Sequence, residues 1–283
     1  MLRYWLLLST TSAAALQGSG AVAKPGRRTA ICTAIGALTT ARSVSAAAPS
    51  TASVYDGTGV KLSRAAIEGK LSKVPVIALV NDEDAPFLTG RGGVGYFFLD
   101  PTEALLELRV LRKTSPEARF KIVSLAEVYF PLVRGEQADL GGELLVRPSR
   151  RQVVQANRAL QFNMREGAFL PTTLDEAKGQ VPVFYSERVA FESGGKTTFP
   201  FFLTKEDLDR AFVELGSPSG SSMTKGDASK VGEGIPVGLV RVATLDGLVN
   251  QMQSGEIDLT EGVLVGSRDA LVAIRSFVQD GMP

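Results

Sequence analysis

The sequence predicts an α/β fold, an α+β sandwich of two pseudo-symmetric lobes that arose by internal duplication. Apolar runs of strand length alternate with helices that begin at recognisable capping residues. The order of these elements occurs twice, and Pro75 in the first copy has its counterpart in Pro182 of the second. The composition, with 44% hydrophobic and 22% charged residues in 283, is that of a soluble globular protein long enough for one large domain or two small ones.

The first copy opens with an apolar run over residues 74–80, which predicts a strand covered on both faces. A polar turn at 81–84 and a short segment at 87–88 follow it. A glycine-rich bend at 90–95 then leads to a second strand over 96–99.

A helix is predicted directly after this strand. Asp100 can cap the free N–H groups of its first turn, Pro101 suits the first helical position, and Glu103 completes a capping-box-like pattern. The apolar stripe of this helix consists of Leu105, Leu108 and Leu111. Residues 120–127 then predict a strand that runs into a polar cap and a short helix.

The second copy repeats the order. Strands are predicted over 181–185 and 199–203, with a glycine turn at 194–196 between them. Thr204 begins the corresponding helix, and residues 237–246 again indicate a strand, a polar cap and a short helix.

A helix over 150–165 is predicted to join the copies. Its expected apolar side consists of Val153, Val154, Leu160 and Met164. Each copy therefore reads strand-strand-helix-strand-helix, in a first lobe at 51–150 and a second at 151–283. Residues 216–234 are rich in Gly and Ser and predict a flexible insertion in the second lobe, with a functional loop as the alternative.

Residues 1–50 have the composition of a targeting segment, rich in Ala, Ser, Thr and Arg and without an acidic residue. Two uncharged stretches stand there, one after Arg3 and one after the pair Arg27 and Arg28. This pattern predicts a cleaved bipartite plastid-targeting segment, whose twin-arginine half indicates the thylakoid lumen. One ordinary transit peptide is the alternative.

Composition excludes whole classes of chemistry. The chain has no histidine and a single cysteine, Cys32, so an imidazole base and a Cys/His zinc site are absent from it. Beyond the targeting segment, acidic residues outnumber basic ones slightly and the signs are mixed. Nothing in this balance indicates nucleic acid or an anionic membrane as a partner.

Several motifs resemble sites but lack the required context. The G-x-G-x-x-G at 90–95 is followed by a strand-like run and not by a helix, and the Gly-Lys-Thr at 195–197 lies between two strands. The S-x-x-K at 222–225 lies in the Gly/Ser stretch. The acidic residues at 81–84 lack EF-hand spacing and read as a solvated turn, and those at 206–209 read as the first turn of a helix. The sequence thus predicts no catalytic, cofactor-binding or metal-binding residue.

Aromatic clusters at 97–98 and 199–202 leave two interpretations open. They form part of the core, or they make an apolar surface for peptide segments. The sequence does not say which aromatic side chains face water.

The repeated residues resemble one known family. They are Val-Pro-Val at 74–76 and 181–183, Phe-Phe-Leu with a capped helix at 97–103 and 201–207, and Val-Ser-Leu-Ala-Glu-Val-Tyr at 123–129. Together they resemble the 22-kDa subunit family of the translocon at the inner chloroplast envelope, over roughly residues 70–275. The resemblance implies a duplicated two-lobed α/β fold, no catalytic residue and no cofactor.

The same resemblance implies a non-catalytic component of plastid protein import. It would bind precursor proteins in transit in a chaperone-like manner, in company with other translocon subunits, and would be peripheral to a membrane at most. The implied compartment is the intermembrane space. Two alternatives remain: a thylakoid-lumen structural or assembly factor that docks on a membrane complex, and an enzyme that relies on Lys, Tyr or carboxylates.

Overall fold

The computed structural model describes residues 59–89, 93–136, 142–164, 173–193, 195–216 and 234–279, which belong to one compact unit of the chain. The predicted targeting segment 1–50 and nearly all of the predicted insertion at 216–234 lie outside the described residues. Within the described part, no helix is both long enough and apolar enough to cross a membrane.

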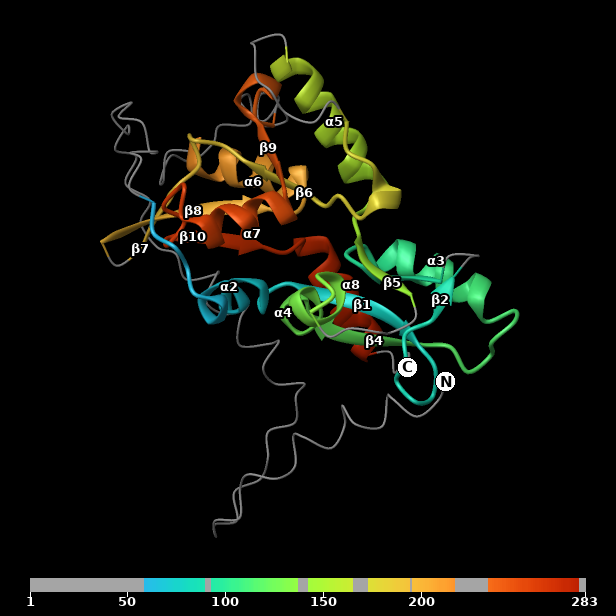
Figure 1. Cartoon of the computed structure of the whole chain (residues 1–283). Helices are drawn as coiled ribbons and strands as arrows, with labels where there is room; N and C mark the ends of the chain where they lie inside the picture. The colour runs from blue at the N-terminus through green and yellow to red at the C-terminus, as the bar shows by residue number, and fades with distance from the viewer. Residues whose placement is uncertain are drawn as a thin grey trace, which may run out of the picture. The chain divides into compact units, whose positions relative to one another are not determined.

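The first half contains one five-stranded sheet and its helices (Figure 1). In chain order the elements are α2 (Arg64–Leu71), β1 (Pro75–Val80), β2 (Leu88–Thr89), β3 (Val94–Phe98), α3 (Pro101–Leu111), β4 (Arg119–Ser124), α4 (Leu125–Val128), the π-helical turn η2 (Tyr129–Val133) and β5 (Glu143–Arg147). The helix α3 begins as predicted, with Pro101 at its start and Asp100 accepting the Thr102 N–H at 2.8 Å.

The second half contains the other sheet. Its elements are α5 (Arg150–Met164), the 3₁₀ turn η3 (Glu176–Lys178), β6 (Pro182–Tyr185), β7 (Phe191–Ser193), β8 (Lys196–Phe202), α6 (Lys205–Gly216), the 3₁₀ turn η4 (Val237–Leu239), β9 (Arg241–Thr244), α7 (Leu245–Ser254), β10 (Gly262–Val265) and α8 (Arg268–Gln279). The expected joining helix is α5, but its apolar side is narrower than predicted, because Val154 is 46% exposed.

The two sheets have the same connectivity. β1 pairs antiparallel with β3 and β4, and β3 pairs in parallel with β5. β6 pairs antiparallel with β8 and β9, and β8 pairs in parallel with β10. The α/β fold is thus confirmed, and each half adds to the predicted unit a short strand (β2 or β7) and a closing parallel strand (β5 or β10). The duplication that would explain this correspondence stays a prediction.

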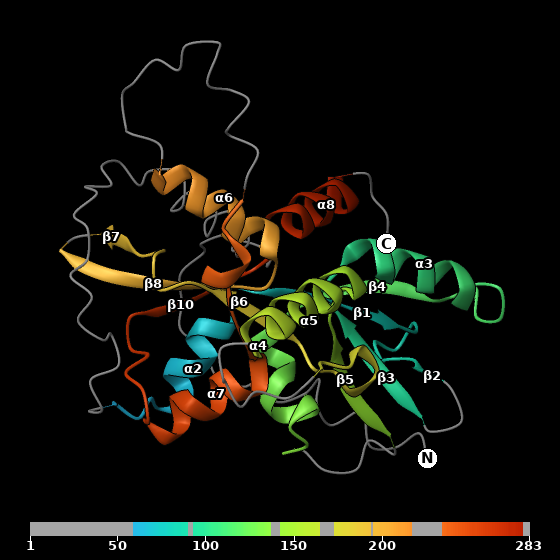
Figure 2. The ribbon, with the colours of Figure 1, turned by 90° about the horizontal axis from the view of Figure 1, so that it is seen from above.

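The helix that follows each sheet along the chain packs on the other sheet or its helices. α5 follows β5 of the first sheet but packs on β6 and β9 of the second, where Val153 and Leu160 meet Phe184. α8 follows β10 of the second sheet but lies beside α3 of the first (Figure 2). There Ile274 of α8 joins the core against β1, and the ring of Phe277 stacks on that of Phe120 at 5.6 Å.

A central core joins the halves. It contains Val76 and Val80 of β1, Val183 of β6 and Phe201 of β8, together with buried residues of α2, α4 and α7. The predicted lobes each form their own sheet, but they share this core.

Polar contacts also cross between the halves. The hydroxyl of Tyr129 donates to the carboxylate of Asp246 at the start of α7, and Arg134 donates to Asn250 at 2.9 Å. Burial first, and then the neighbouring Asp246, raise the pKa of Tyr129, so it stays a neutral donor.

Candidate binding site

Most residues of the aromatic clusters belong to the core, whereas Phe199 is only partly buried. Phe97, Phe98, Phe201 and Phe202 are all buried, and Phe184 is completely inaccessible. Of the two interpretations that the sequence left open, packing is therefore correct for these residues, and a binding surface has to be sought elsewhere.

A cavity of about 400 Å³ lies beside β9, the strand that ends the second sheet. Most of its lining is apolar and comes from α5, β6, β8, β9, α7 and the segment after α7. The lining residues are Leu160, Leu174, Tyr185, Phe201, Val242, Ala243, Thr244, Gly247, Leu248, Gln251, Ile257 and Leu259. Its size and apolar lining are those of sites that bind small molecules or side chains, which span roughly 300–1,000 Å³.

The lining comes from both faces of the sheet. Leu160 and Leu174 belong to the core under α5, whereas Leu248 and Leu259 belong to the central core on the opposite face. One cavity reaches both faces by passing the edge of a sheet, and β9 is an edge strand. The cavity therefore follows the edge of β9.

Local sequence explains the shape of this edge. Thr244 ends β9 and caps α7, because its Oγ1 accepts the N–H of Gly247 at 3.0 Å. Ser124 caps α4 in the same way at the end of β4. Gly247 in the first turn of α7 carries no side chain into the cavity that it lines.

Few polar groups reach the cavity. Tyr185 packs its ring against that of Phe201, with ring centres 5.4 Å apart. Burial raises the pKa of its phenol, so the hydroxyl is neutral at physiological pH. Together with Leu259, these two residues also line a much smaller cavity of about 30 Å³. The site can accommodate apolar groups, with Tyr185, Thr244 and Gln251 as polar contacts.

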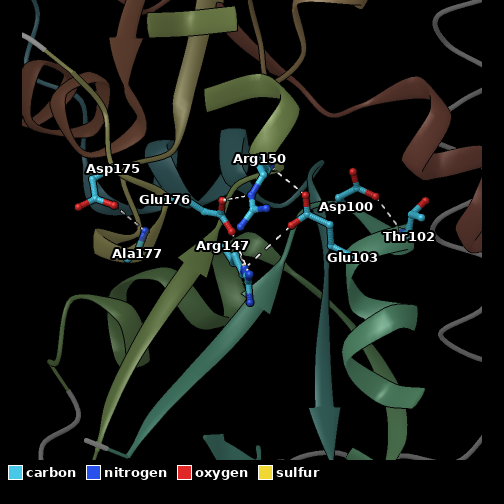
Figure 3. A network of polar contacts seen from close by, with 8 residues as sticks. All are labelled: Asp100, Thr102, Glu103, Arg147, Arg150, Asp175, Glu176 and Ala177. Carbon is cyan, nitrogen blue, oxygen red and sulfur yellow. Dashed lines mark hydrogen bonds and ion pairs between the residues drawn. The ribbon is translucent and has the colours of Figure 1, made fainter. Parts of the chain in front are cut away.

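An ionic network holds α5, one wall of the cavity, on the first half (Figure 3). Arg147 at the end of β5 donates to Glu176 at 2.9 Å, and Glu176 also accepts from Arg150 at 3.3 Å. Glu103 of α3 accepts the backbone N–H of Arg150 at 2.9 Å. Glu103 thus caps α5 and not its own helix, which differs from the predicted capping box.

The network is partly buried and its charges are paired. The guanidinium of Arg147 lies over the rings of Tyr96 and Phe98, 5.2 and 5.6 Å from their centres. Burial raises the pKa of Glu103, and the hydrogen bond from the Arg150 backbone opposes the rise. Because each acid has a basic partner, the network positions α5 and leaves no free charge for chemistry.

The motifs that resemble known sites in the sequence have structural roles wherever they fall within the described residues. Residues 90–92 of the G-x-G-x-x-G lie outside the described residues, and β3 follows at Val94. Gly195, at φ +78°, lies in the turn from β7 to β8. Asn81 accepts the N–H groups of Glu83 and Ala85, as expected of a turn. Glu206 lies in the first turn of α6, as predicted, and it also accepts hydrogen bonds from Gln152 and Gln155 of α5.

The S-x-x-K at 222–225 lies outside the described residues, among which no cluster of three or more acidic, His or Cys side chains could hold a metal ion. The cavity was missed by the sequence reading because its lining residues are scattered from 160 to 259. The only local signal was the pair Thr244 and Gly247 after a short apolar strand.

Two sheets of equal connectivity that share one core define the class, a two-sheet α/β protein with an apolar cavity at the edge of its second sheet. The chain belongs to the Tic22-like family, whose model matches residues 18–265. This confirms the resemblance stated from the sequence. The match begins inside the predicted targeting segment.

The comparisons include one curated relative and two solved structures. "Protein TIC 22-like, chloroplastic" of Arabidopsis thaliana is 26% identical over 205 residues, which is 70% of this chain but only 58% of that protein. Tic22 from Plasmodium falciparum has a TM-score of 0.53 at 20% identity and covers 77% of this chain and 99% of its own. Anabaena Tic22 (protein transport) has a TM-score of 0.54 at 17% identity, with 76% and 97% covered. These two structures show the same fold.

Proposed function

We propose that this protein takes part in protein transport into a plastid and holds precursor proteins in transit by reversible, non-catalytic binding of apolar segments. Membership of the Tic22-like family supports this, as do the chloroplastic name of the Arabidopsis relative and the transport label of the Anabaena structure. The observation that carries the proposal is the apolar cavity along the edge of β9.

The cavity suits weak and broad binding. Burial of apolar surface contributes about 25 cal/mol per Å², without regard to the identity of the side chain. Ordering an unfolded client offsets much of that gain, so each contact is readily reversed. A protein that passes precursors onward needs both properties, and neither requires a nucleotide or a metal.

The compartment and the partners belong to the same proposal. The family resemblance favours the intermembrane space with other translocon subunits as partners, whereas the twin-arginine segment favours the thylakoid lumen. Fractionation of plastids, with protease protection of the mature chain, distinguishes the two.

Photocrosslinking tests the function. A photoreactive residue replaces Gln251, which lines the cavity, while labelled precursors are arrested in isolated plastids. Val110, exposed on α3 far from the cavity lining in sequence and fold, is the control position. We expect crosslinks from position 251 to several unrelated precursors that disappear when transport finishes, and few from position 110. Crosslinks from both positions to one folded resident complex would contradict the proposal and favour an assembly factor.

A further inference from the structure

We infer that the client segment adds to β9 as an extra strand, so that its backbone pairs with the edge of the second sheet while its apolar side chains enter the cavity. This inference rests on the proposed function and specifies how the same site binds. The ligand class is an extended, β-prone apolar peptide segment.

The register of β9 shows which backbone groups face outward. Leu245 donates its N–H to the carbonyl of Val181 at 2.9 Å, in line with the pairing of Ala243 with Val183. Hydrogen-bonded and non-bonded pairs alternate in an antiparallel ladder. Ala243 therefore bonds inward to β6, whereas the N–H and C=O groups of Val242 and Thr244 point away from the sheet.

The outward groups of Val242 lack a protein partner among the described residues. Within this part of the chain, no hydrogen bond outside the ladder with β6 reaches the N–H or C=O of Val242, although this residue is only 4% exposed. Buried backbone groups are nearly always paired, and an extended peptide supplies a matching donor and acceptor at every second residue. The edge of β9 is therefore an incomplete ladder beside an apolar cavity.

The cavity fits the two faces of such a strand. Successive side chains of a strand point to opposite faces. An added strand would meet Leu160 and Leu174 on one face, and Leu248 and Leu259 on the other. The segment best accommodated is thus apolar at successive positions, like the buried strands of this protein, and free of proline. Because β9 has four residues, the paired stretch is about as short.

The first sheet offers a matched edge. In β4, Leu125 donates to Val74 at 2.8 Å, so by the same alternation the backbone groups of Ile122 point outward. Here Arg119 and Lys121 bind Asp84 at 2.6 and 2.8 Å beside the edge. Charged side chains on an edge strand oppose pairing with another chain. Ile122 is therefore the natural control for Val242.

The test uses a defined probe. A fluorescein-labelled peptide, Lys-Val-Ile-Ala-Leu-Val-Lys, whose apolar centre copies residues 76–80 of β1, is titrated with the full chain, next to the same peptide with its five central amides N-methylated. N-methylation removes the donors of both strand edges and keeps the apolar side chains. We expect fluorescence anisotropy to show at least a tenfold loss of affinity on methylation, and hydrogen exchange at the Val242 amide to slow when the unmodified peptide is bound.

Two variants sharpen the test. Val242→Pro removes the outward N–H without removing a bond to β6, and Ile122→Pro does the same on β4. Peptide affinity falls at least tenfold in Val242→Pro and stays within twofold in Ile122→Pro. If Val242→Pro fails to fold, hydrogen exchange at the Val242 amide of the natural chain tests strand addition, because a bound strand slows this exchange.

The outcomes separate the two proposals. Equal binding of the methylated and unmodified peptides, with Val242 exchange unchanged, overturns strand addition, and crosslinks from position 251 then still support the transport function. Absence of both peptide binding and crosslinks overturns both proposals.

Discussion

The two sheets are connected in the same way, but the strands that end them, β4 and β9, lie in different surroundings. Beside β4, Asp84 pairs with Arg119 and Lys121. Beside β9, an apolar cavity reaches both faces of the sheet. Equal connectivity therefore leaves charged side chains on one edge strand and an apolar cavity beside the other, and our proposal of strand addition rests on this difference.

The largest expected effect tests whether the halves are independent. Phe184→Ala removes a fully buried ring from the core between α5 and the second sheet, and we expect a loss of about 3–5 kcal/mol in the free energy of unfolding. Because the halves share the central core, urea unfolding monitored by fluorescence and by circular dichroism follows one transition. Two separate transitions, with only the second half weakened, would contradict the shared core.

A smaller effect concerns the exchanged helices. Glu103 accepts the first N–H of α5, and Asp207 accepts the N–H of Arg268 at the start of α8, at 3.0 Å. Each replacement by alanine removes a cap, at a cost of about 1–2 kcal/mol in urea unfolding. Asp207→Ala also removes the ion pair with Arg210 at 3.0 Å and the hydrogen bond from the Thr204 hydroxyl, so it is the more destabilising of the two. Equal stability of Glu103→Ala and the natural chain would show that α5 is held without its cap.

The smallest effect concerns the charged edge. Hydrogen bonds from Lys121 and then from Arg119 lower the pKa of Asp84. Because the folded-state pKa is the lower one, this stabilisation is complete above the unfolded value of about 3.9 and is lost as the pH falls through the folded pKa. Asp84→Asn, which tolerates the left-handed backbone at φ 64°, costs less than about 1 kcal/mol at pH 7, because the pair is partly exposed.

Unfolding titrations at pH 7 and pH 2.5 measure this difference. The gap between Asp84→Asn and the natural chain is smaller at the lower pH. A gap that is equal at both values would assign the effect to the turn and not to the charge.

Local chemistry explains how much could be predicted. Asp100 with Pro101 marked the start of α3, and the glycines at 194–195 marked the β7–β8 turn, because caps and turns depend on neighbouring residues. The α/β class followed from these elements. The closing strands β5 and β10 were missed, since an apolar run of four or five residues does not show by itself which strand it pairs with.

Long-range features could not be predicted in this way. The residues of α5 and α8 do not indicate which sheet each helix covers. The amphipathic pattern of α5 wrongly placed Val154 on the buried side of the helix. Glu103 looked like a local cap but binds residues more than 40 positions away. The cavity depends on the same kind of distant contact, so it became visible only with the fold.

The exchange of α5 and α8 has a consequence for how the protein is made. α8 is the last described element of the chain, yet it completes the core on β1, the first strand. Part of one face of the first sheet, which α3 does not cover, therefore stays exposed until α8 has been made. Contacts between such distant segments form slowly, because a long loop has to close before they contribute. The first half accordingly remains incompletely folded until α8 has left the ribosome and packed on it.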